Sequence, residues 1–91
     1  MVFLYYNVYM DNTELNQIIG KNVKKYRLLY NINIGKMTQE NLAEAVNCSV
    51  SLISSLESNN INKGVSLLTL FNISVVLKTP INKFFEDNTN S

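Results

Sequence analysis

The sequence contains no histidine, one cysteine (Cys48), one proline and three glycines among its 91 residues. Without histidine, catalytic groups built on an imidazole base are excluded, and so is a tetrahedral zinc site made of cysteine and histidine. One cysteine cannot form a disulfide within the chain, which fits a reducing compartment, so we expect a cytoplasmic protein. The low content of proline and glycine disfavours turn-rich all-β folds. We therefore expect an all-α protein that is not an enzyme and has no cofactor.

Charge and long apolar runs are also scarce. The formal net charge is only +1, so the charge balance alone does not indicate a nucleic-acid partner. No apolar run approaches the roughly 18 residues that a membrane span requires, and we expect no membrane partner. Glu40 and Glu44 lie one helical turn apart, but no second pair of ligands accompanies them, so we expect a solvated face and no metal site.

The first ten residues, MVFLYYNVYM, differ from the remainder of the chain because they are apolar or aromatic, with mainly β-branched and aromatic types, and only Asn7 interrupts them. One interpretation is an arm or strand that pairs with a second copy. The other is that translation begins at Met10 and the preceding residues are an artefact. We divide the chain into an N-terminal extension (residues 1–12), one domain (13–87) and a polar tail (88–91), because 91 residues suffice for one compact domain.

Apolar residues at spacings of three and four predict a first helix that Asn12 or Thr13 caps and that ends near Asn31. Residues 31–37 contain Gly35 and alternate polar with apolar side chains, which predicts a loop. Thr38 is a suitable N-cap for a second helix over residues 39–46. The pattern so far predicts two amphipathic helices joined by a loop.

A third helix is predicted over residues 49–58, after a turn of about three residues. Asn47 can adopt the left-handed backbone conformation that a sharp helix exit needs, and Ser49 can cap the helix. Its interior side chains are predicted to be Leu52, Ile53 and Leu56. The other face of this helix carries small, mostly polar side chains.

Ser66 is predicted to cap a fourth helix, which Pro80 ends. The residues assigned to its inner side are Leu67, Leu70, Ile73, Ser74 and Leu77. A short fifth helix over residues 81–85 follows.

The motif Thr38-Gln39-Glu40-Asn41-Leu42-Ala43-Glu44, followed by Ser49 to Ser54 and by Leu56-Glu57, resembles the lambda-repressor-like helix-turn-helix family, the Cro and xenobiotic-response-element group. The resemblance covers roughly residues 19–87. It implies a compact five-helix bundle that binds double-stranded DNA, with the third helix in the major groove. It further implies a small transcriptional regulator, most commonly a repressor.

The resemblance also assigns individual residues. Those expected to face the bases are Ser49, Val50, Ser51, Ser54 and Ser55. Those expected to contact the DNA backbone are Thr38, Gln39, Asn59, Asn60, Asn62 and Lys63, with Lys36 as a further candidate. The alternative for the asparagines is that they only form turns. Arg27 and Glu57 are implied to form a structural, partly buried ion pair.

Three features depart from the family pattern. The loop between Arg27 and Thr38 is several residues longer than usual, and Asn47 and Asn59 stand where glycine is common. The third helix has no Arg, Lys, Gln or Asn before Asn59, although these side chains make the common bidentate base contacts. A competing hypothesis is therefore a protein-interaction module, such as an antitoxin-like or DNA-binding-deficient helix-turn-helix protein.

A single module with such short contact residues is expected to bind DNA weakly, which favours a homodimer. Two surfaces are candidates for the dimer contact. One is the fifth helix, with Ile81, Phe84 and Phe85, and the other is the apolar N-terminal arm. The alternative is that both belong to the core of the monomer.

Overall fold

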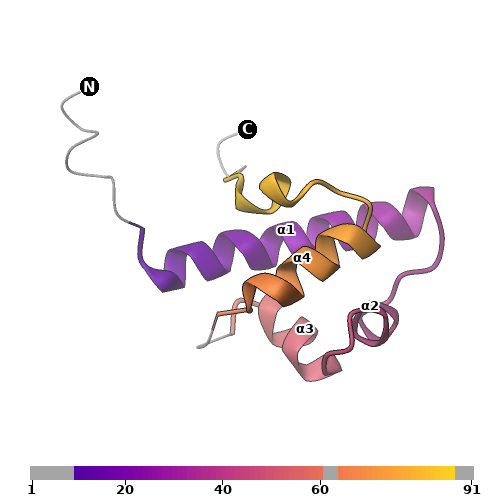
Figure 1. Ribbon diagram of the computed structural model, residues 1–91, viewed down its shortest axis with the longest axis horizontal. Helices are drawn as coiled ribbons and strands as arrows, with labels where there is room; N and C mark the ends of the chain where they lie inside the picture. Colours follow the sequence, from indigo (N-terminus) through magenta and orange to yellow (C-terminus); the bar gives the residue numbers. More distant parts are fainter. Residues whose placement is uncertain (1–9, 61–63, 88–91) are drawn as a thin grey trace.

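The computed structural model describes residues 10–60 and 64–87, and all regular structure in these ranges is helical (Figure 1). The elements are α1 (Asn12–Asn33), α2 (Gln39–Ala45), α3 (Val50–Glu57), α4 (Leu67–Val76) and the 3-10 helix η2 (Ile81–Phe85). The predicted all-α class is confirmed. The predicted short fifth helix over residues 81–85 is present as a 3-10 helix and not as an α-helix, and the Lys83 amide in it donates to the Pro80 carbonyl at 3.0 Å.

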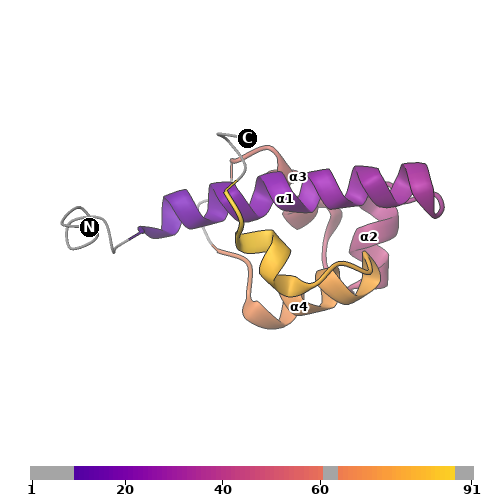
Figure 2. The same ribbon diagram turned by 90° about the horizontal axis from the view of Figure 1, so that it is seen from above.

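The long helix α1 runs along the whole molecule, and the shorter elements gather along it (Figures 1 and 2). It packs mainly against α3 and η2, while α2 packs against α3 and α4, and α4 packs against η2. The core between them consists of Ile19, Val23, Met37, Leu42, Ala43, Val46, Ile53, Leu56, Leu70, Ile73, Leu77 and Phe84. None of the helices in the described ranges is long and apolar enough to cross a membrane.

Each α-helix begins at a residue whose side-chain oxygen accepts a hydrogen bond from a free backbone amide of the first turn. The predicted N-caps Thr38, Ser49 and Ser66 are confirmed. The predicted cap of α1, Asn12 or Thr13, is wrong, since the cap is Asp11, which accepts from the Glu14 amide at 2.8 Å. The helix also extends two residues further than expected, to Asn33.

The turn η2 is fixed to the middle of α1 by one asparagine side chain. Asn22 is 3 % exposed, and its Nδ2 donates to the carbonyl oxygens of Phe84 at 2.9 Å and of Glu86 at 2.8 Å. Phe84 is fully buried and its ring lies 5.4 Å from that of Tyr26. The prediction that Phe84 contributes to a dimer surface is therefore wrong, because its side chain belongs to the core.

Replacement of Asn22 by leucine tests this contact. The variant keeps the branched shape of the side chain but leaves the Phe84 and Glu86 carbonyls without this donor. We expect a loss of about 2 kcal/mol in the free energy of unfolding, measured by urea denaturation. Lys24→Ala, at an exposed position of the same helix, is the control and should change stability by less than about 0.5 kcal/mol. Equal stabilities of the two variants would show that the hydrogen bonds from Asn22 do not hold η2 against α1.

The orientation of α4 differs from the prediction. Leu70, Ile73 and Ser74 are buried as expected, but Leu67, which was assigned to the inner side, is 71 % exposed. The helix is apolar nearly all round, so the sequence pattern could not select its buried face. Three further predictions lie outside the described residues: the N-terminal arm, the polar tail, and the contacts of Asn62 and Lys63.

Candidate nucleic-acid interface

Two short helices, α2 and α3, meet through a connection of four residues, 46–49. Asn47 has a φ of 57°, the left-handed conformation that the sequence predicted and that asparagine adopts more readily than most residues. The next amide, that of Cys48, donates to the carbonyl of Ala43 at 2.9 Å. The turn is therefore closed by backbone hydrogen bonds on the α2 side and by the Ser49 cap on the α3 side.

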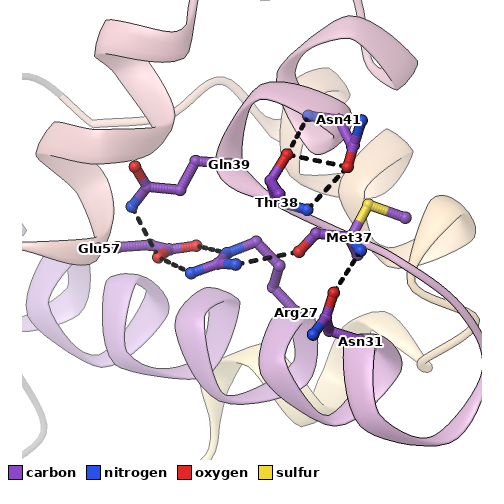
Figure 3. A network of polar contacts seen from close by, with 7 residues as sticks. All are labelled: Arg27, Asn31, Met37, Thr38, Gln39, Asn41 and Glu57. Carbon is purple, nitrogen blue, oxygen red and sulfur yellow. Dashed lines mark hydrogen bonds and ion pairs between the residues drawn. The ribbon is translucent and has the colours of Figure 1, made fainter.

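Arg27 on α1 and Glu57 on α3 form the ion pair that the resemblance implied (Figure 3). The guanidinium binds the carboxylate through two bonds, Nε to Oε2 at 2.7 Å and Nη2 to Oε1 at 2.9 Å. Nη1 donates to the Met37 carbonyl at 3.0 Å. Two parallel hydrogen bonds fix the orientation of the guanidinium relative to the carboxylate as well as the distance between them. The pair therefore sets how α3 lies against α1.

Gln39 joins this network from the first turn of α2. Its Nε2 donates to Oε1 of Glu57 at 3.0 Å, so one carboxylate receives hydrogen bonds from both α1 and α2 (Figure 3). The side chain of Glu57 is only 2 % exposed, and among the described residues no buried side-chain polar atom lacks a hydrogen-bond partner. The arrangement of α1, α2 and α3 is thereby fixed by a satisfied polar network.

The loop before α2, residues 34–38, is tied both to α1 and to α2. Asn31 Oδ1 accepts from the Met37 amide at 2.6 Å, and Met37 itself is buried in the core. Thr38 and Asn41 form a capping box, because the Thr38 hydroxyl accepts from the Asn41 amide and Asn41 Oδ1 accepts from the Thr38 amide, both at 3.0 Å. The extra residues of this loop therefore do not loosen the start of α2.

The outer side of α3 carries the residues that were predicted to face the bases. Ser49, Val50, Ser51 and Ser54 are exposed, whereas Ser55 is half-buried. Ile53, Leu56 and Glu57 are buried on the opposite side, and Leu52 is half-buried. Since Glu57 is the only charged residue of α3 and is paired inside, the outer side is a neutral surface of hydroxyl and methyl groups.

The predicted backbone-contact residues are distributed around the ends of α2 and α3. Thr38 and Gln39 are half-buried at the start of α2, and Asn59 and Asn60 are exposed after the end of α3. Asn59 has a φ of 63°, so it forms the turn that ends α3, as the alternative interpretation held. Any contact of these residues with phosphate stays a prediction.

Other kinds of site receive no support from the described residues. They contain no group of three or more Cys, Asp or Glu side chains that could hold a metal ion. Burial raises the pKa of the Cys48 thiol, so this side chain stays protonated and is a poor nucleophile. The residues that sequence reasoning missed are Asn31, Met37 and Asn41. Of these, only Asn41 had a local signal, since it lies three residues after the Thr38 cap.

Comparisons of the sequence with models of protein families and with curated proteins find no match.

Proposed function

We propose that this protein binds double-stranded DNA in a sequence-specific manner and regulates transcription as a repressor, with α3 in the major groove. One observation carries the proposal. The outer side of α3 presents only small side chains, while its inner side is fixed to α1 and α2 by Arg27, Glu57 and Gln39. A rigidly held helix whose outer side is uncovered can lie in the major groove with its N-terminal residues against the base edges. The resemblance to lambda-repressor-like proteins supports the same arrangement.

The chemistry of α3 defines how bases would be read. The major groove is about 12 Å wide and admits one helix. Serine hydroxyls at positions 51 and 54 can donate to or accept from base edges, and Val50, 41 % exposed, can contact a thymine methyl. Such short side chains favour contacts through ordered water and modest discrimination at each base pair. A two-fold dimer on half-sites roughly 34 Å apart would combine two of these weak modules.

Contacts to the DNA backbone would come from the ends of the two helices. The side-chain amide nitrogen of glutamine carries two N–H donors. Gln39 uses one of them for Glu57, and the other is suited to a phosphate oxygen. Thr38, Asn59, Asn60 and the exposed Lys36 complete the proposed set. Of the three residues predicted to form a dimer surface, Phe85 is exposed, Ile81 is half-buried and Phe84 is buried.

The test is selection of bound duplexes from a random DNA pool by the purified protein. We expect a two-fold symmetric site, bound cooperatively, and about tenfold weaker binding by Ser51→Ala, because one base contact is lost. Lys24→Ala, on the exposed side of α1, should bind with unchanged affinity. Binding without sequence preference that disappears with rising salt would contradict the proposal.

A second candidate is a protein-interaction module. The observation that favours it is the neutral surface of α3, which lacks the Arg, Lys, Gln and Asn side chains that make most base contacts. In that case the same selection enriches no sequence, and substitutions on α3 weaken the capture of a protein partner instead.

A further inference from the structure

The outer side of α4 is apolar and exposed. Leu67, Leu68, Phe71 and Val75 are between 51 % and 71 % exposed, and three of them follow one another at intervals of four residues, which places them in one stripe along the helix. The helix contains no charged residue. Helices that are apolar all round are normally covered on all sides, but within the described residues α4 packs mainly on α2 and η2. We call these four side chains the α4 stripe.

The size of the α4 stripe indicates what kind of partner covers it. Four such side chains offer on the order of 400 Å² of apolar surface, the size of patch that often serves as a contact site. A stable dimer buries about 800 Å² on each partner. The stripe alone is therefore too small for a second copy packed through α4, but its area suits a short segment of chain.

The chain itself contains a segment of matching chemistry. Residues 2–9, VFLYYNVY, are apolar or aromatic except for Asn7, and none is charged. Neither the segment nor the α4 stripe has a charge that would favour solvent, and both lose water-exposed apolar area when they are brought together. No other stretch of eight residues in the chain is so rich in aromatic side chains.

The segment is also attached at a suitable place. It precedes Met10, directly before α1, and α1 and α4 begin toward the same end of the molecule (Figures 1 and 2). Gly64, three residues before α4, lies against Asn16 in the second turn of α1, since a Cβ on Gly64 would be 3.2 Å from Asn16 Oδ1. Nine residues can span about 30 Å, twice the length of about 15 Å that the ten residues of α4 have.

We propose that residues 2–9 pack along the α4 stripe of the same chain and complete the hydrophobic core on that side. The segment is then a structural part of the domain. This inference does not depend on DNA binding, and it gives α4 the cover that its composition requires.

Thermodynamic coupling between the two parts tests the proposal. Phe71→Ser is made in the full chain and in a shortened chain that begins at Met10. If the segment covers Phe71, the substitution lowers the melting temperature of the full chain by about 5 °C or more and leaves that of the shortened chain unchanged. Ile32→Ser, at an α1 position that is 76 % exposed, is the control and should have equal effects in both chains. Equal effects of Phe71→Ser in both chains would overturn the proposal.

Cross-linking then identifies which chain supplies the segment. In a Cys48→Ser background, Leu4→Cys is combined with Leu68→Cys, and disulfides are allowed to form under mild oxidation. A cross-link within one chain is expected. Cross-links found only between two chains would overturn packing within one chain in favour of segments exchanged between copies. The pair Leu4→Cys and Lys24→Cys, with Lys24 on the exposed side of α1, is the control and should cross-link far less.

Discussion

Replacement of Gly20 by alanine is expected to destabilise the protein by about 3 kcal/mol, although alanine normally stabilises a helix relative to glycine. Gly20 is buried in α1 at the place where α3 ends against it. A Cβ at this position would overlap the carbonyl oxygen of Leu56 and lie 3.1 Å from its carbonyl carbon. Both are backbone atoms of α3, so no side-chain rotation can make room. The two helices must separate, and the core between them then packs less well.

The control for this prediction is Gly35→Ala. A Cβ on Gly35 would meet no atom within 4 Å, and neither this glycine nor any other described one has a positive φ. Its substitution should leave stability unchanged or raise it by about 0.5 kcal/mol, because alanine restricts the unfolded chain. Urea denaturation of both variants measures the difference. A Gly20→Ala variant as stable as Gly35→Ala would show that α1 and α3 are not packed as closely as described.

The limits of the helices could be predicted because their signals are local. Thr38, Ser49 and Ser66 each precede an apolar pattern of helical spacing, and a hydroxyl that caps free amides acts within three residues. Asn47 was recognised for the same reason, since its conformation depends mainly on its own side chain. Asp11 was missed because three neighbouring residues, 11–13, are all suitable caps.

The arrangement of the helices could be predicted only in part. For α4 the apolar residues occupy seven of the ten positions and lie on all sides of the helix, so periodicity gave no reason to place Leu67 outside and Leu70 inside. The role of Phe84 also depends on a partner distant in sequence: the Asn22 side chain holds its carbonyl from 62 residues away. Asparagine is frequent in the chain, and nothing local distinguishes Asn22, which clamps η2, from those that form turns.

In the candidate site, too, features set by local sequence could be predicted, and contacts between distant residues could not. The exposed serines of α3 follow from the helical pattern, because burial of Ile53 and Leu56 places Ser51 and Ser54 outside. The pairing of Arg27 with Glu57, 30 residues apart, came from the resemblance alone. The Met37 carbonyl accepts a hydrogen bond from the same guanidinium, and nothing in the sequence indicates this contact.

Arg27→Met is expected to cost about 4 kcal/mol, a large share of the 5–15 kcal/mol that stabilises a typical domain. The methionine fills a similar volume but removes both bonds to Glu57 and the bond to the Met37 carbonyl. Among the described residues, the Glu57 side chain, 2 % exposed, then keeps only Gln39 as a hydrogen-bond donor from another side chain. Urea denaturation measures the loss. Lys24→Met, at an exposed position of α1, is the control and should change stability by less than about 0.5 kcal/mol.

The double variant Arg27→Met with Glu57→Leu separates the two roles of this pair. Without either charge no carboxylate is buried unpaired, so we expect most of the stability to return. The direction in which α3 lies is then no longer set by a bidentate contact. If that contact positions α3 for the major groove, the double variant folds but binds the selected DNA site at least tenfold more weakly. Stability as low as that of Arg27→Met would mean that the side chains contribute through packing and not through charge. Unchanged DNA affinity would show that packing alone orients α3.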